Sequence, residues 1–516
     1  MSAFIDARTL PDKTVLAPDL AIIGGGPAGI SLALALADTR LNIALLESGG
    51  TNFDPRIQKM YAGSESGVAY TPLEAGRLRF LGGSSNHWGG YCRPLDEIDF
   101  ETRDWVPHSG WPIGRKELMP YYRRAQALVE AGPWVYDDGG AAVTAAKGAP
   151  LPLGQGGLYT SWFQFSKTRD NVLPTYFGHR YEAELKAAKT VTPYLHVNVT
   201  GIRLARDARQ VDHLDLATLD SNGGAGKRFT VKPRFVVLAA GGMENARLLL
   251  ASNDVMTPGV GNQNDLVGRF FSDNPIPRDV ATLVSFAGPL ASYYGANTTM
   301  DNGAIMRAVF STRRQYCESQ RNVGSLTTVE QATELDETGK AAVITTALAL
   351  GVDASNAKAY SLGCGMELIP DPDRRLVLTA EKDALGLPRL KLNMTIADED
   401  FALYRRTLAE LGRQLLAGRT GMLRINYSHR EEYITNIYLD FYNMDFDYFK
   451  ENLYNKIKCN TNYAFLIKVI PAAAVGDAVG LEQHREPAGA GRPVGAPAAR
   501  GLAQVDRSGV VSGLLA

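Results

Sequence analysis

The segment that decides the fold begins at residue 20 and reads Leu20-Ala-Ile-Ile-Gly24-Gly-Gly26-Pro27-Ala28-Gly29-Ile-Ser-Leu-Ala-Leu-Ala-Leu-Ala37, with Asn42-Ile-Ala-Leu-Leu46 after it. Short apolar runs bounded by glycine indicate buried strands, and the longer alanine and leucine run between them indicates a helix. We therefore predict a strand over 20–23, a helix over 30–37 and a strand over 42–46. Together they form one βαβ unit of a parallel sheet.

The glycines of this unit follow the G-x-G-x-x-G pattern in the context that dinucleotide binding requires, between a strand and a helix. Gly24 allows the tight turn, Gly26 lets the backbone approach a pyrophosphate, and Gly29 lets the helix pack closely on the strand. Glu47 ends the second strand, where a carboxylate can accept hydrogen bonds from a ribose. The unit predicts a dinucleotide site, and this motif alone leaves NAD and FAD open.

Segments later in the chain predict a second strand–turn–helix unit and further strands and helices. The residues 234–238 read as a strand, a second glycine turn at Ala240 and Gly241 follows, and 243–250 read as a helix. Residues 191–204 alternate like one strand, and Gly76 to Gly90 form a loop rich in glycine and serine. From about 276 to 370 the pattern is mainly β-like, with Ala342–Leu350 as a strand, and Glu399–Leu416 is predicted as an amphipathic helix.

Several segments resemble the glucose-methanol-choline (GMC) oxidoreductase family, and within it the branch of the pyranose oxidases. They are the loop Gly82-Gly83-Ser84-Ser-Asn86-His87-Trp-Gly-Gly90, the stretch 236–249, and the shorter motifs at 110–113, 120–122, 267–271, 370–374 and 383–389. The resemblance runs from about residue 18 to about residue 424.

The resemblance implies an α/β chain with a discontinuous Rossmann-type FAD-binding domain and a second α+β substrate domain on an antiparallel sheet. We expect the FAD-binding domain over 15–115 and 190–275 and the substrate domain over 116–189 and 276–425. The loop with Gly83, Ser84 and Asn86 would lie along the flavin, and Val199 would pack near the adenine. We expect this loop, the turn at Gly24 and the turn at Ala240 and Gly241 to form one cleft for the cofactor at the carboxyl ends of the parallel strands. The alternative for Val199 is an ordinary strand residue.

His87 has three interpretations. In the pyranose oxidases a histidine of a similar loop is joined covalently to the flavin, and the resemblance implies that His87 is that attachment point. The alternatives are a flavin contact without a bond and a packed loop histidine. A neutral imidazole nitrogen is nucleophilic enough for such a bond.

Family members oxidise alcohols by hydride transfer to flavin N5 while a base, usually histidine, removes the hydroxyl proton. We therefore predict an FAD-dependent oxidoreductase acting on a CH–OH group of an alcohol, polyol or sugar, with an electron acceptor that the sequence does not identify. The C-terminal family pattern that supplies the base is absent after Ile425, and His429 and His484 do not match its context. The catalytic base stays unknown. A flavin-binding protein without turnover is the alternative.

The remaining features exclude other classes of function. The 54 basic and 55 acidic residues nearly cancel, which argues against nucleic acid or a membrane surface as partner and suits a small neutral substrate. The four cysteines show no metal or disulfide spacing, and the N-terminus has no signal-like apolar run. We therefore expect a cytoplasmic protein. The composition changes twice within residues 426–516, and we assign no fold to this C-terminal tail. Separately, we expect the charges of Glu381 and Asp383 to be solvated.

Overall fold

A five-stranded parallel sheet forms the centre of one lobe of the computed structural model, which describes residues 4–136, 147–166, 174–273, 275 and 277–426. Its strands run in the order β1 (Ile5–Asp6), β8 (Val191–Leu195), β4 (Ile43–Leu46), β3 (Leu20–Ile23) and β12 (Phe235–Leu238), and every neighbouring pair is parallel. Strands β3 and β4 are buried at every residue because both faces of the sheet are covered.

The two faces of β3 belong to different cores. Leu20 and Ile22 pack with Ile30 of α1 (Pro27–Ala35) and with the short helices α5 (Phe177–Arg180) and α6 (Glu182–Ala187). Ala21 and Ile23 face a second sheet. The predicted strand, helix and strand over 20–46 are confirmed, with small shifts at their ends.

The second sheet has the order β2 (Val15–Leu16), β11 (Ala225–Val231), β10 (Val211–Leu219) and β9 (Asn198–Leu204). The prediction of one strand over 191–204 was wrong, because β8 and β9 lie in different sheets. The chain turns between them at His196, whose φ is 60°. The predicted second unit is confirmed as β12 followed by α7 (Gly242–Ala251).

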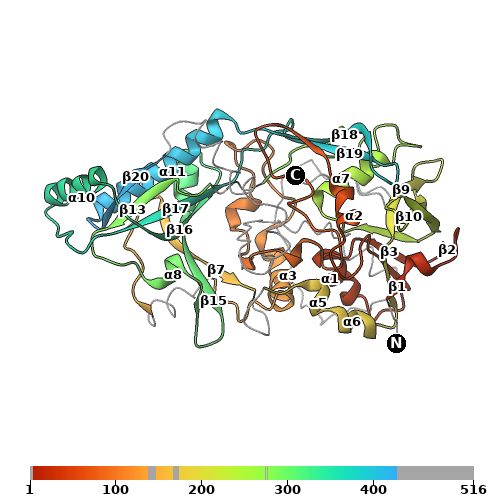
Figure 1. Cartoon of the computed structure of the whole chain (residues 1–516). Coiled ribbons are helices and arrows are strands. Elements are labelled where there is room, and N and C mark those ends of the chain that lie inside the picture. The colour runs from red at the N-terminus through yellow and green to blue at the C-terminus, as the bar shows by residue number, and fades with distance from the viewer. Residues whose placement is uncertain (1–3, 137–146, 167–173, 274, 276, 427–516) are drawn as a thin grey trace, which may run out of the picture.

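The other lobe is built on an antiparallel sheet, at the left of Figure 1. Its strands run in the order β20 (Gly421–Ile425), β13 (Ala281–Ser285), β17 (Lys358–Met366), β16 (Ser325–Thr333), β15 (Ile305–Thr312), β7 (Leu158–Phe165) and β6 (Tyr91–Cys92), and β14 (Thr298–Thr299) pairs with β15. Helix α11 (Asp398–Ala417) packs its leucines into the core of this lobe, which confirms the helix predicted over 399–416.

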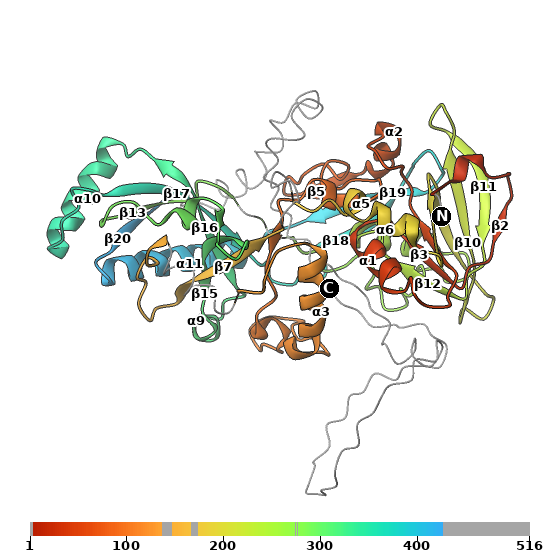
Figure 2. The ribbon, with the colours of Figure 1, turned by 90° about the horizontal axis from the view of Figure 1, so that it is seen from below.

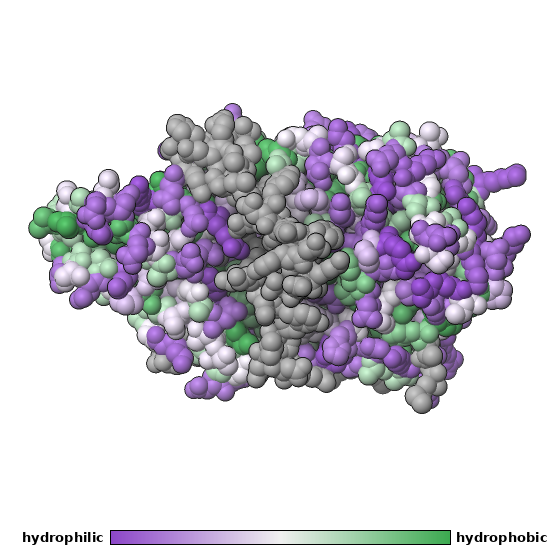
Figure 3. Space-filling model, viewed as in Figure 1, coloured by the Kyte–Doolittle hydropathy of each residue, from purple (hydrophilic) through white to green (hydrophobic). Residues whose placement is uncertain are grey.

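The strand predicted over Ala342–Leu350 was wrong, because these residues lie in helix α10 (Glu337–Leu350). The β-branched run Val343 to Thr346 favours a strand locally, but the helix signals at both ends are stronger. Asp336 caps the first turn by accepting from the Gly339 N–H, and Gly351 ends the helix with a φ of 65°. Figure 3 shows a hydrophobic patch at this end of the molecule, where Ile344 and Leu348 are exposed.

A small sheet of β18 (Arg375–Lys382), β19 (Pro388–Met394) and β5 (Ser64–Gly67) links distant parts of the chain. Its hairpin packs on α7 of the first lobe (Figure 1), and Figure 2 shows β5 near β18 and β19. The remaining helical segments are η1 (Ala7–Thr9), α2 (Pro55–Gln58), η2 (Lys59–Tyr61), η3 (Gly83–Asn86), η4 (Glu97–Phe100), α3 (Arg115–Leu128), α8 (Ser292–Gly295) and α9 (Arg314–Gln320).

The sheets establish the expected fold class, an α/β chain with a parallel and an antiparallel sheet. The sheet pairings also cross the expected domain ranges. Strand β6 lies in the antiparallel sheet, β1 lies in the parallel sheet, and the β18–β19 hairpin packs on α7. The ranges 15–115 with 190–275 and 116–189 with 276–425 therefore stay a proposal. The tail from 427 onward lies outside the described residues.

Candidate functional site

The first glycine turn has the conformation that its sequence predicts. Gly24 has a φ of 108°, and a Cβ there would lie 2.5 Å from the carbonyl oxygen of Ala239. A Cβ on Gly29 would lie 1.9 Å from the carbonyl oxygen of Gly24, so α1 packs directly against the turn. Pro27 and Ala28 occupy the first turn of α1, where backbone N–H groups have no partner inside the helix.

The loop after Gly76 meets this turn through its backbone. The Gly82 N–H donates to the Gly25 carbonyl at 2.7 Å, and a Cβ on Gly83 would lie 3.2 Å from Cα of Gly26. Gly82 and Gly83 both have positive φ, 98° and 51°, which explains the paired glycines. Two segments that are far apart in the sequence thus lie in contact.

The second glycine turn joins the same place. Gly24 packs on Ala239 and on Ala240, whose N–H donates to Asn245 Oδ1 of α7 at 3.0 Å. Gly241 precedes α7 with a φ of 84°. Among the described residues, nothing lies within 4 Å of a Cβ built on Gly26 or Gly241. The structure therefore brings the three predicted loops together at the carboxyl ends of β3 and β12 and leaves their glycines open on one side.

Glu47 holds the backbone around the first glycine turn through hydrogen bonds. Its side chain is buried and accepts the Gly25 N–H at Oε2 and the Gly49 N–H at Oε1, each at 2.8 Å. Ser48 Oγ also donates to Oε1, at 3.1 Å, and Oε2 can accept a further hydrogen bond, so the ribose contact predicted for Glu47 is compatible with these contacts. Arrangement and charge fit an anionic nucleotide on the helix N-terminus with its ribose at Glu47.

His87 follows the short helix η3 and is buried. Its Nε2 has no hydrogen-bond partner among the described residues, which is unusual for a buried polar atom. Burial lowers the pKa of His87 to about 4, so the imidazole is neutral at physiological pH. A neutral ring with an unused nitrogen fits a group that contacts a bound cofactor. The attachment itself stays a prediction.

The other predicted residues of the loop and of β9 have structural contacts. Ser84 Oγ accepts the Leu78 N–H at 3.3 Å, and Asn86 Nδ2 donates to the Leu81 carbonyl at 3.0 Å, so both shape the loop. Val199 and Ala240 pack against the same hydrophobic core. The contact of Val199 with adenine stays a prediction.

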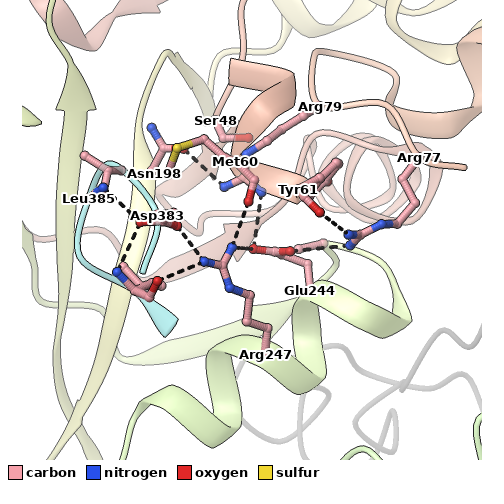
Figure 4. Close-up of polar contacts among 12 residues, drawn as sticks. Ser48, Met60, Tyr61, Arg77, Arg79, Asn198, Glu244, Arg247, Asp383 and Leu385 are labelled. Carbon is pink, nitrogen blue, oxygen red and sulfur yellow. Dashed lines mark hydrogen bonds and ion pairs between the residues drawn. The ribbon is translucent and has the colours of Figure 1, made fainter. Parts of the chain in front are cut away.

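A buried cluster of charged residues beside the glycine turns was not predicted. We call Arg77, Arg79, Glu244, Arg247 and Asp383 the Glu244 cluster (Figure 4). Asp383 Oδ2 lies 2.6 Å from Arg247 Nη2, and its side chain is 1% exposed, so the expectation that Asp383 is solvated was wrong. A pairing across more than 130 residues leaves no local signal in the sequence. Glu381, in contrast, is exposed.

A metal centre finds no support in the part of the chain that the structure describes, because no group of three or more His, Cys, Asp or Glu side chains could hold an ion there. No described helix is long and apolar enough to cross a bilayer. His429 and His484 lie outside the described residues, so the geometry assigns no catalytic base.

Comparisons with known proteins identify distant relatives. A 2-methyl-1,2-propanediol dehydrogenase of Mycolicibacterium austroafricanum is 25% identical in an alignment of length 371, which covers 60% of this chain and 66% of that protein, just under two thirds of its length. The fructose dehydrogenase large subunit of Gluconobacter japonicus is 24% identical in an alignment of length 473, which covers 78% of this chain and 83% of that protein. No family model matches the chain.

One solved structure that resembles this chain is a formate oxidase of Aspergillus oryzae RIB40, from a study of FAD modification. It is 13% identical with a TM-score of 0.44, and the match covers 84% of this chain and 87% of that one. None of these three proteins is named a pyranose oxidase, and that branch stays a prediction. Both relatives bear the names of dehydrogenases, which supports an oxidoreductase. At these identities the relatives do not place the chain in a family, and the GMC-type family stays a prediction.

Proposed function

We propose that this chain oxidises a CH–OH group of a small alcohol, polyol or sugar, with hydride passing to N5 of a bound FAD. One observation carries the proposal: three glycine-lined backbone segments, far apart in sequence, meet at the carboxyl ends of adjacent parallel strands. In open α/β sheets this edge is where nucleotides bind. The names of the two dehydrogenase relatives, one for a diol and one for a sugar, support the substrate class.

Different residues of the chain would hold different parts of the FAD. The N-terminal N–H groups of α1 and the open backbone at Gly26 bind and orient the pyrophosphate. Glu47 accepts from the ribose, and Val199 contacts the adenine. Gly83, Ser84 and Asn86 form the loop along the ring system, and Ala240 and Gly241 close the other side.

For His87 we propose contact with the flavin, with covalent attachment as the stronger form. The unpaired, neutral Nε2 supports either form. Acid precipitation of the purified protein separates them, because flavin colour stays in the pellet only when the cofactor is bonded. His87→Gln should release the colour to the supernatant if His87 is the attachment point, and a pellet that stays yellow in this variant would point to another residue.

The proposed activity is tested by adding a panel of sugars, polyols and alcohols without oxygen and following the visible flavin absorption. Bleaching by one of them supports the proposal. The second candidate, a flavin protein without turnover, is favoured by the missing family pattern after Ile425. It predicts a bound flavin that dithionite bleaches and that no member of the panel does. A colourless protein that binds NADH would overturn both.

A further inference from the structure

Leu81 and Gly82 are held by backbone hydrogen bonds to the carbonyls of Gly50 and Gly25, whereas the segment 77–80 that leads into this loop is held mainly by side chains. Between residues 77 and 80 the chain has neither helix nor strand. The Gln58 side chain accepts the Arg79 N–H, and the guanidiniums of Arg77 and Arg79 lie over the Tyr61 ring, 4.0 and 4.7 Å from its centroid. Because the segment 77–80 lies in neither a helix nor a strand, the contacts of its two arginines contribute to its position.

Both arginines contact Glu244, which lies in the first turn of α7 directly after the second glycine turn. Arg77 Nη1 lies 3.4 Å from Oε2 of Glu244, and Arg79 Nη1 lies 3.2 Å from Oε1 (Figure 4). One carboxylate thus joins two of the three glycine loops. Arg79 Nη2 also donates to Asn198 Oδ1 at 3.1 Å, and Asn198 is the neighbour of Val199.

Arg247 completes the cluster from the next turn of α7. Its Nη1 lies 3.0 Å from Glu244 Oε1, and its Nη2 pairs with Asp383 of the β18–β19 hairpin. Burial alone would raise the pKa of the Glu244 carboxyl, but the guanidiniums of Arg79, Arg247 and Arg77 together lower it to about 2. Glu244 is therefore charged at physiological pH, and its charge is balanced inside the protein.

Burying so many charges is a costly way to join elements, since desolvation opposes each ion pair and apolar packing is often as stable. Guanidinium–carboxylate pairs differ from apolar contacts in that they fix distance and direction. We propose that Glu244 is a positioning residue for cofactor binding: through Arg77 and Arg79 it holds the loop with Gly83 at a set distance from the turn at Ala240 and Gly241. The inference rests on the proposed function, because both loops are those assigned to FAD.

The chain offers a matched control. Glu244→Gln and Asp383→Asn each replace one buried carboxylate by an amide of the same shape, and each removes one partner of Arg247. Only Glu244 contacts the loop arginines. Asp383 instead accepts the Leu385 and Leu387 N–H groups and orders the hairpin. Both variants should lower the midpoint of thermal unfolding, so stability alone does not distinguish them.

The experiment is a titration of each flavin-free chain with FAD below its unfolding temperature, carried out in a His87→Gln background if the flavin is found to be bonded to His87. We expect Glu244→Gln to weaken FAD binding by roughly 10-fold or more, about 1.4 kcal/mol, and Asp383→Asn to keep the wild-type dissociation constant within about 2-fold. Equal losses in both variants, or wild-type affinity in Glu244→Gln, would overturn the proposal. Failure of the wild-type chain to bind FAD would instead overturn the proposed function.

If Glu244→Gln does not fold, a second variant tests whether the cluster positions the loop for FAD binding. Arg79→Lys keeps the positive charge, but a single ammonium cannot reproduce the fork that reaches Glu244 and Asn198 together. We expect the same direction of loss in FAD affinity, accompanied by an altered circular dichroism of the bound flavin. Wild-type affinity and an unchanged flavin signal in this variant would contradict the positioning role.

Discussion

Replacing Gly26 by alanine separates cofactor binding from folding. Gly26 is the N-cap of α1 with φ −81° and ψ −176°, a conformation open to every residue, and nothing described lies within 4 Å of the added Cβ. Alanine stiffens the unfolded chain, which stabilises by about 0.4–1 kcal/mol. It is also a poorer N-cap than glycine, which costs a similar amount. We expect the free energy of unfolding without FAD to change by less than about 1 kcal/mol.

FAD binding should respond strongly to the same change. The open side of Gly26 is where we place the pyrophosphate, and a methyl group there moves the phosphate out of reach of the backbone. A hydrogen bond to a charged group contributes about 1.5–3 kcal/mol, so losing one weakens binding by roughly 10- to 150-fold. Gly26→Val, with a branched side chain, should abolish cofactor retention.

The assay is a titration of the deflavinated protein with FAD, followed by quenching of flavin fluorescence, beside a thermal melt without FAD. Gly114→Ala is the matched control: Gly114 is also an extended N-cap glycine, at the start of α3, and a Cβ there meets only Glu117 Oε2, at 3.7 Å. It should bind FAD as the wild type does. Normal flavin loading in Gly26→Ala and Gly26→Val would refute the placement of the cofactor.

Three further results are expected. Gly29→Ala should destabilise the protein by about 3 kcal/mol or more, because its Cβ would meet the Gly24 carbonyl oxygen at 1.9 Å; an unchanged melting temperature would contradict the packing described. Burial lowers the pKa of His87 to about 4, so the imidazole binds a proton more readily in the unfolded chain than in the folded one. The free energy of unfolding should therefore fall as pH drops from about 6.5 toward 4, by about 2 kcal/mol between pH 7 and pH 5. Urea unfolding of His87→Gln should lack this component, and an identical pH profile would count against a buried neutral imidazole. Asp400→Ala removes the carboxylate beside the buried Arg374, 3.3 Å away, and should lower the free energy of unfolding by about 3 kcal/mol, measured by urea denaturation; a change near zero would show that Arg374 does not depend on that charge.

The parts of the fold that the sequence predicted are those with strong local signals. Buried strands at 20–23 and 43–46, the glycines between them and the amphipathic period of α11 each depend on residues close together in the chain. The meeting of the three loops was predicted from the resemblance and from the rule that carboxyl ends of parallel strands share one edge. The structure confirms that meeting.

The parts that were missed depend on distant partners or on competing local signals. Val343 to Thr346 favour a strand on their own, and the caps at Asp336 and Gly351 decide for a helix. Asp383 looks like a turn residue beside Lys382, and its burial follows from Arg247, which is 136 positions away. Nothing near residue 77 or residue 79 indicates that both arginines share Glu244, because the contact arises only when α7 and the loop pack together.

The flavin content of the purified wild-type chain tests the central claim most directly. If the loops at Gly26, Gly83 and Gly241 cradle a nucleotide, the protein should carry or take up one FAD per chain, with the visible absorption of a protein-bound flavin. A colourless chain that takes up no FAD, at concentrations where it is folded, would contradict the account.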